Sequence, residues 1–198
     1  MLEHDWDHWR SKMGTEYSEK DVTYEKFMRT KFYGIETPMD LAALMDLMCR
    51  HKDMYYMTDF KNCYDQNEVI SGFQQIVQAA EEAGCVDVLK RFIIQNHHNQ
   101  FKHWVDSVYP FENWVYTCYS IPVDKDRLPE NLTAYCSQEG IPIITMWYYM
   151  PNDTWFSYAQ KYNLKIFIHT VNDVEYAKAQ LSAGVAGVYT DDIKPPIG

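Results

Sequence analysis

Polar residues that could contact an anion or a metal ion recur directly after short apolar segments of the sequence. In parallel α/β proteins ligands bind beyond the carboxyl ends of the strands, so these positions form the candidate site. They are Asp59, Lys61, Gln95, Asn96, Tyr119, Trp147, His169, Thr170, Thr190, Asp191 and Asp192. Oxygen ligands for Ca²⁺ or Mg²⁺ and a lysine for phosphate suit metal-assisted phosphoryl chemistry. Solvated loops give the same pattern, so no single position identifies the site.

The histidines carry a weaker signal. The segment 4–8 places two imidazoles and two carboxylates within five residues, His4-Asp5-Trp6-Asp7-His8. It lacks the glutamate beside the first histidine that a helical zinc protease motif requires, and spacing alone favours solvated side chains over a general acid or base. His97, His98 and His103 have no cysteine partners at the spacing of a structural zinc site and are expected at the surface. The sequence contains no serine-hydrolase elbow and no P-loop.

The elements that must position these residues alternate along the chain. Six apolar runs rich in β-branched and aromatic residues predict strands at 54–58, 91–95, 114–119, 142–146, 165–169 and 185–190. Apolar residues at helical spacing lie between them, so the sequence predicts an α/β fold with a parallel sheet. Thr37 and Pro38 predict the start of the first helix, Asp153 is expected to cap a later one, and Asn172 with Glu175 resembles a capping box. Gly84 and Gly184 predict helix ends.

Two architectures accommodate six such strands. A doubly wound sheet is expected to show a glycine-rich first turn, and no G-x-G-x-x-G is present. A closed barrel of eight strands usually needs about 250 residues, whereas the chain has 198. A barrel therefore implies that its first strands are absent from this sequence.

Composition limits the classes of function. The chain is 46% hydrophobic and has a formal net charge of -10, which disfavours nucleic-acid binding because phosphates need clustered Lys and Arg. No apolar run reaches the ~20 residues of a membrane span, and the opening residues do not resemble a signal peptide. The five cysteines are scattered without a C-x-x-C and are expected to be reduced, which favours a cytoplasmic location.

Several short motifs, in their order along the chain, resemble the glycerophosphodiester phosphodiesterase family. The most specific is the pair near the carboxyl end, an H/W-T-V-N strand end followed by a G-V-x-x-x-T-D strand. The motifs are His4-Asp5, Thr58-Asp59-Phe60-Lys61, Ile93-Ile94-Gln95, His169-Thr170-Val171-Asn172 and Gly187-Val188-Tyr189-Thr190-Asp191. The resemblance covers nearly the whole chain.

This resemblance implies a TIM-type (β/α) barrel with a small insertion, here at about 6–36, in a single domain spanning 1–198. It implies a metal-dependent hydrolase that converts glycerophosphodiesters to glycerol 3-phosphate and an alcohol, with Ca²⁺ or Mg²⁺ as cofactor. It maps the second of the family's two catalytic histidines onto His4, a metal-binding carboxylate onto Asp59 and a phosphate-contacting lysine onto Lys61. Gln95, His169 and Asp191 are expected to contact the substrate.

The chain also departs from the family pattern. The H-R-G and E-x-D motifs, which precede the His-Asp motif in the family, are missing, Asp59 stands where Glu is more frequent, and His169 stands where Trp is common. The sequence therefore predicts an N-terminally truncated barrel with about six of eight strands and impaired activity. Its exposed strand edges predict self-association. The alternatives are a non-catalytic barrel that binds a phosphodiester or a partner chain, and a phosphoinositide-type phospholipase-like barrel.

Overall fold

The computed structural model describes residues 22–31, 34–60, 63–118 and 128–194. The chain divides into two compact units, one containing residues 1–55 and 72–89 and the other residues 56–71 and 90–198. Of the insertion predicted at 6–36, most lies outside the described residues. Within the described ranges, no helix combines the length and the apolar character needed to cross a membrane.

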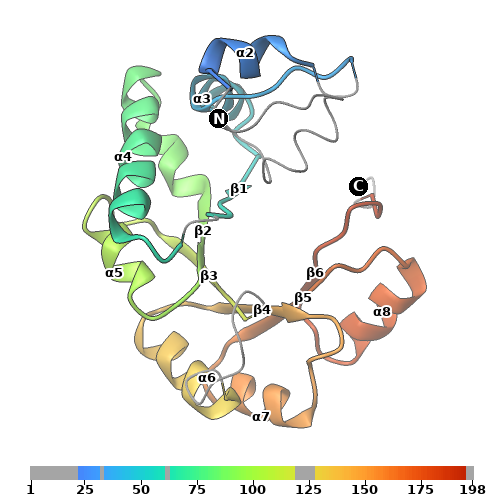
Figure 1. Ribbon diagram of the computed structural model, residues 1–198. Helices are drawn as coiled ribbons and strands as arrows, with labels where there is room; N and C mark the ends of the chain where they lie inside the picture. Colours follow the sequence, from blue (N-terminus) through green and yellow to red (C-terminus); the bar gives the residue numbers. More distant parts are fainter. Residues whose placement is uncertain (1–21, 32–33, 61–62, 119–127, 195–198) are drawn as a thin grey trace. The chain divides into compact units, whose positions relative to one another are not determined.

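The second unit contains a parallel sheet of six strands in sequential order (Figure 1). The sheet curls through 215°, so it forms about half of a barrel wall. The six predicted strands and the TIM-type fold class are confirmed, although the first and last strands are shorter than expected. The strands are β1 (Tyr56–Met57), β2 (Phe92–Asn96), β3 (Asn113–Thr117), β4 (Ile143–Trp147), β5 (Lys165–His169) and β6 (Gly187–Val188).

Helices connect the strands in succession, as parallel pairing requires. They are α4 (Gln66–Glu82), which begins in the second unit and continues in the first, α5 (Phe101–Asp106), α6 (Pro129–Gln138), α7 (Asp153–Lys161) and α8 (Val174–Ser182), with a 3₁₀ helix at Val86–Arg91. The helix ends follow local chemistry: Pro129 occupies the first turn of α6, Gly84 lies beyond α4 at a φ of 65°, and Asn152 caps α7. Asn152 replaces the predicted cap Asp153, which is the first residue of the helix.

The two faces of the sheet differ in what covers them. On the face toward the helices, Tyr116 packs against Tyr135 of α6, and the Lys102 ammonium of α5 lies 4.9 Å from the ring centre of Trp114. Ile144, Met146, Ile166 and Ile168 are buried there as well. Side chains alternate along a strand, so the intervening residues point to the opposite, concave face.

Close packing on the concave face explains the glycine in β6. Gly187 pairs with Phe167 of β5, and a Cβ at Gly187 would lie 2.6 Å from the Phe167 ring. A side chain at this position would force the ring to move. Gly187 therefore permits β6 to pair beside an aromatic residue.

The first unit contains α2 (Tyr24–Arg29), α3 (Leu41–Arg50) and most of α4. Phe27, Leu44, Met45 and Met48 are buried in it. The side chain of Asp40 accepts a hydrogen bond from the Ala43 N–H, 2.8 Å away, and caps α3. The helix thus begins after Asp40, and the prediction that Thr37 is its N-cap is wrong.

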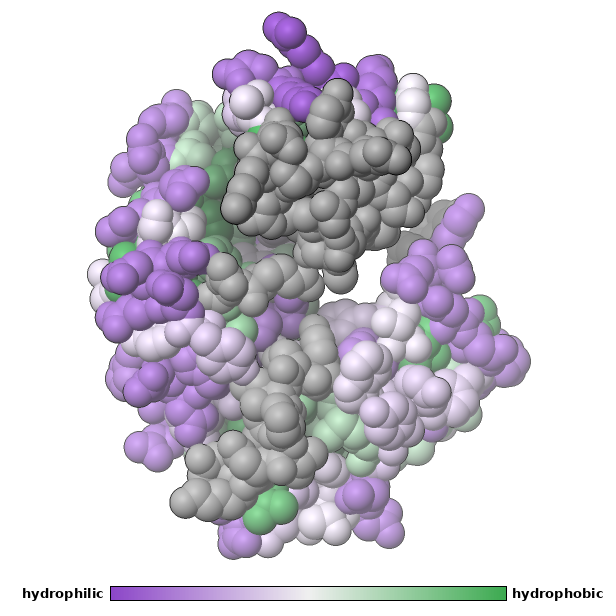
Figure 2. Space-filling view, viewed as in Figure 1, coloured by the Kyte–Doolittle hydropathy of each residue, from purple (hydrophilic) through white to green (hydrophobic). Residues whose placement is uncertain are grey.

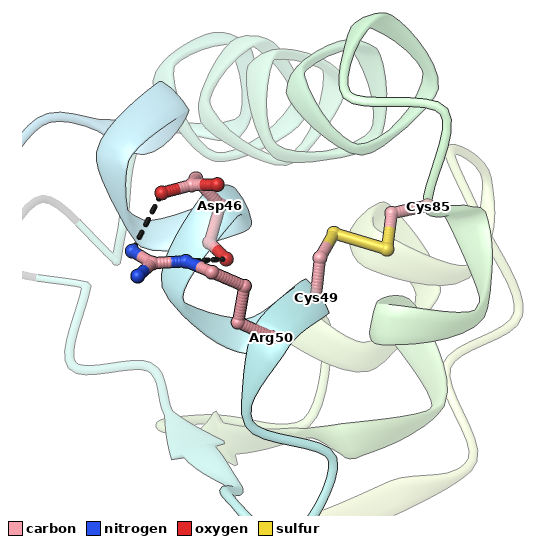
Figure 3. The surroundings of a disulfide bond; sticks show 4 residues. All are labelled: Asp46, Cys49, Arg50 and Cys85. Atoms are coloured by element: carbon pink, nitrogen blue, oxygen red, sulfur yellow. Dashed lines mark hydrogen bonds and ion pairs between the residues drawn. A yellow bond between two sulfur atoms is a disulfide. The ribbon is translucent and has the colours of Figure 1, made fainter.

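A disulfide joins Cys49, at the end of α3, to Cys85, which follows α4 (Figure 3). The Cα atoms lie 6.1 Å apart, within the usual range for a disulfide. The prediction that all five cysteines are reduced is therefore wrong for this pair, while Cys63, Cys118 and Cys136 are buried thiols that take no part in a disulfide of the described residues. Disulfides persist mainly in oxidising compartments, so the cysteines no longer argue for a cytoplasmic location.

Reduction of the disulfide is expected to destabilise the chain. The bond closes a loop across a sequence separation of 36 residues, and loss of such a constraint typically costs about 2–4 kcal/mol. Thermal unfolding with dithiothreitol should therefore show a Tm lowered by roughly 5–10 °C. The Cys49→Ser/Cys85→Ser double variant should start at the lower Tm and be insensitive to reductant. Five titratable thiols in the untreated, unfolded protein would contradict the pairing.

Candidate active site

Buried polar side chains gather at the carboxyl ends of the strands on the concave face. Gln95 of β2, Thr117 of β3, Thr145 of β4 and His169 of β5 are all less than 9% exposed. The register places Thr117 beside Thr145, and Trp147 beside His169. We call this end of the concave face the carboxyl edge.

Thr117 differs from its neighbour at the carboxyl edge. The Thr145 hydroxyl donates to the Tyr116 carbonyl oxygen at 3.4 Å. The Thr117 hydroxyl is fully buried and has no hydrogen-bond partner within the described residues. A buried hydroxyl without a partner costs free energy, so this group is suited to contact a ligand. Thr117 is not among the residues predicted for the site, because the strand predicted at 114–119 has Thr117 in its interior and Tyr119 at its end.

Asp59 and Gln95 lie at the first two strands of the edge. Gln95 is buried, and its N–H donates to the Thr58 hydroxyl at 3.3 Å, which joins β2 to the residue before Asp59. The Asp59 side chain is exposed. Burial raises the pKa of Tyr56, and the nearby negative charge of Asp59 adds to the effect.

His98 fixes the loop that follows Asp59. Its Nε2 donates to the Cys63 carbonyl oxygen at 2.7 Å, and its Nδ1 accepts from the Gln100 N–H at 3.3 Å. Its ring also stacks on Tyr64. Because both ring nitrogens are used, His98 positions the loop. The surface position predicted for His97 is wrong because this residue is buried, whereas His98 is half-buried and His103 is exposed as predicted.

His169 ends β5 in an aromatic environment. Its ring centre lies 4.3 Å from that of Trp147 and 6.5 Å from that of Tyr189. Burial lowers the pKa of His169 below its ordinary value, so the neutral imidazole is favoured at neutral pH. A neutral imidazole at this position can accept or donate a hydrogen bond to a ligand.

Asn172 and Asp191 connect the last two strand ends. The Asn172 Oδ1 accepts from the Thr190 hydroxyl at 3.0 Å and from the Asp191 N–H at 2.8 Å, and its Nδ2 donates to Asp191 Oδ2 at 3.2 Å. Asn172 therefore does not form the predicted capping box. The adjacent Asp173 caps α8 instead, accepting from the Tyr176 N–H at 2.7 Å.

The structure places the predicted site residues in two groups. Asp59 and Gln95 lie at β1 and β2, whereas His169 and Asp191 lie at β5 and just beyond β6. All four are at the same end of a parallel sheet, with β3 and β4 between the groups. The predicted catalytic His4 and the phosphate-contacting Lys61 lie outside the described residues.

The described residues do not form a complete metal site. Across those ranges, no three His, Cys, Asp or Glu side chains come together as ligands for one ion. Asp59 offers a carboxylate oxygen, which suits Ca²⁺ or Mg²⁺ as a single ligand but not as a whole coordination sphere.

Loss of the Asn172 side chain is expected to loosen the end of β6. Asn172→Ala removes three hydrogen bonds at an exposed position and should lower the free energy of unfolding by about 1–2 kcal/mol. Amide hydrogen exchange at Asp191 and Ile193 should accelerate in the same variant. Lys178→Ala, which removes an exposed ion pair with Glu175, is the control and should change stability by less than about 0.5 kcal/mol. Unchanged exchange at Asp191 would contradict the bridging role.

The lowered pKa of His169 predicts a specific pH dependence. Below about pH 6.5, His169 is protonated in the unfolded chain but stays neutral in the folded chain, because its pKa is lower there. The free energy of unfolding therefore decreases as the pH falls from about 6.5 toward the pKa of His169 in the folded chain. His169→Gln removes this contribution. Urea unfolding between about pH 7 and pH 5 should show a smaller loss of stability in the variant, and equal losses would refute the assignment.

Solved structures of glycerophosphodiester phosphodiesterases share this fold. A candidate enzyme from Silicibacter pomeroyi superposes with a TM-score of 0.62 at 18% identity, covering 80% of this chain and 54% of that one. The enzyme from Parabacteroides distasonis gives 0.61 at 12% identity, covering 85% and 66%. A candidate from Galdieria sulphuraria gives 0.66 at 15% identity, covering 86% and 66%.

Sequence comparison adds nothing to these structural matches. No family model matches the chain, and no curated protein matches it. The chain spans between about half and two thirds of the length of the solved structures described above. The resemblance seen in the sequence motifs is supported at the level of architecture: the curled parallel sheet has the fold of part of a glycerophosphodiester phosphodiesterase barrel.

Proposed function

We propose that the carboxyl edge binds a glycerophosphodiester and supports its hydrolysis to glycerol 3-phosphate and an alcohol. The observation that carries the proposal is the set of buried polar side chains at this edge, where the Thr117 hydroxyl has no hydrogen-bond partner among the described residues. The ordered motifs and the shared fold support the choice of substrate class. Ligands of α/β barrels bind at this end of the strands.

In the proposed reaction, water adds to phosphorus and the bond to the alcohol oxygen breaks. The alcohol leaves with a proton, and the phosphate stays on glycerol. From the family resemblance, His4 donates that proton and Lys61 contacts the phosphoryl oxygens. Gln95, Thr117 and His169, which are buried at the carboxyl edge, would hydrogen-bond the phosphodiester and orient it in this proposal.

The metal requirement is a separate part of the proposal. A divalent cation, Ca²⁺ or Mg²⁺, would neutralise charge on the phosphoryl oxygens, with Asp59 as one ligand. Additional ligands would have to come from residues outside the described ranges, since those ranges contain no complete site.

The activity is tested by release of glycerol 3-phosphate from glycerophosphodiesters, with Ca²⁺ or Mg²⁺ added. His4→Ala should lower the rate at least about 100-fold. Thr117→Val, which keeps the shape and removes the unpartnered hydroxyl, should lower kcat/KM roughly tenfold with little loss of stability. His103→Ala, an exposed histidine of α5, is the matched control. A chelator should abolish activity if the cation proposal holds.

The same preparation separates the proposal from its main alternative. Absence of glycerol 3-phosphate with either cation would refute hydrolysis by this chain, and a rise in Tm with the diester would then favour a non-catalytic binding barrel.

Among the described residues, β1 pairs with β2 alone and β6 with β5 alone, so each has an edge on which copies could associate. Light scattering on the sample tests this association, and a monomer at all concentrations would exclude it.

A further inference from the structure

A cluster of exposed aromatic side chains lies next to the proposed phosphodiester site. Trp147, Tyr148 and Tyr149 end β4 and begin the turn after it, and they are 37%, 45% and 68% exposed. Tyr176 of α8 is 38% exposed, and its ring lies against that of Tyr148. In Figure 2 pale side chains of intermediate hydropathy lie beside the purple, hydrophilic surface of α8. Large aromatic side chains left partly exposed together indicate a binding surface.

Two of these tyrosines form the walls of a small cavity of about 170 Å³, which we call the tyrosine pocket. It is lined by Tyr148, Thr170, Val171, Asn172, Asp173 and Tyr176. The rings of Tyr148 and Tyr176 stand at 89° to one another with centres 6.0 Å apart. A ligand in the pocket can therefore contact the face of one ring and the edge or face of the other.

The protein holds the pocket in place through the backbone of β5. The Tyr148 N–H donates to the His169 carbonyl oxygen at 3.0 Å, and the Trp147 carbonyl accepts from the Met150 N–H at 2.9 Å, which closes the turn. The Tyr176 hydroxyl lies 3.5 Å from the Tyr148 carbonyl oxygen. The pocket is thus fixed to the strand that carries His169, and Thr170 belongs to both regions.

The charges around the pocket favour a cation over an anion. It lies at the amino end of α8, where free N–H groups would attract an anion. Asp173, however, occupies the cap, accepts the Tyr176 N–H and places a carboxylate in the pocket wall. The chain carries a net charge of -10, and in the described part of the chain no cationic side chain pairs with Asp173. An anion would meet repulsion here.

We infer that the tyrosine pocket binds a methylated ammonium group. Aromatic faces attract such a cation through the ring quadrupole, its methyl groups pack on the rings, and Asp173 supplies the opposite charge. Because the pocket adjoins His169 and Thr170, this group would be the head of the alcohol that the proposed hydrolysis releases. That last step rests on the proposed function, whereas binding of the cation does not.

Choline and its uncharged isostere 3,3-dimethylbutan-1-ol test the inference directly on the full chain. Calorimetric titration should show choline binding with a dissociation constant on the order of 1 mM, and much weaker binding of the isostere. Tyr148→Leu and Tyr176→Leu should each weaken choline binding about 3- to 10-fold. Tyr148→Phe keeps the ring and should bind normally. Asp173→Asn keeps the helix cap but should weaken binding similarly.

Controls separate a specific pocket from general effects. Tyr55→Leu removes a more exposed tyrosine from the other unit and should leave choline binding unchanged. Equal affinity for the uncharged isostere, or no choline binding by the folded chain, would overturn the inference. Sedimentation with phosphatidylglycerol vesicles that Tyr148→Leu abolishes, without choline binding, would also overturn it and assign the aromatic surface to a bilayer.

Failure of this inference and failure of the proposed function give different results. Release of glycerol 3-phosphate without choline binding would overturn the pocket and leave the hydrolysis standing. Choline binding without release from any diester would support the pocket and refute the hydrolysis. Preference for a choline diester over an ethanolamine diester, lost in Tyr148→Leu, would support both.

Discussion

Parallel pairing of all six strands is the constraint on which the rest of the structure depends. Each strand enters the sheet in the same direction, so every connection must return along the outside as a helix or a long crossover. The carboxyl ends of the strands consequently lie at one edge, and residues far apart in the sequence are brought to it. Gln95, Thr117 and His169 meet at the same end of one face for this reason.

The two faces of the curled sheet carry different kinds of side chain. The face toward the helices is packed with buried apolar side chains and aromatic contacts, and burial of this apolar surface stabilises the unit. The concave face carries buried polar groups toward the carboxyl edge, and the hydroxyl of Thr117 has no hydrogen-bond partner among the described residues. Such groups cost stability unless a ligand or water satisfies them. These groups at one edge are the observation on which the proposed phosphodiester site rests.

The sequence predicted the number, order and parallel pairing of the strands because apolar periodicity reports which segments are buried. The segment 165–169 was predicted with correct bounds, whereas β6 is shorter than predicted. The N-cap residues of the helices were predicted less accurately, because neighbouring Asn and Asp side chains can cap a helix equally well. Asp173 rather than Asn172 caps α8, and Asn152 rather than Asp153 caps α7.

Features that depend on distant contacts could not be predicted from local patterns. The Cys49–Cys85 disulfide joins residues with no motif between them, and it corrects the expectation of five reduced thiols. Thr117 has an ordinary strand sequence around it, and its lack of a partner follows only from its neighbours in the sheet. The tyrosine pocket likewise combines the turn after β4 with α8, two segments separated by β5.

The central claim is that a phosphodiester binds at the carboxyl edge, and mapping of a product onto the chain tests it most directly. Titration of isotopically labelled protein with glycerol 3-phosphate should shift the amide resonances of Gln95, Thr117, His169 and Thr190. The resonances of Asn113 and Lys165, at the opposite ends of β3 and β5, should not move. Shifts confined to those opposite ends or to α3, or no shifts at saturating ligand, would contradict the account.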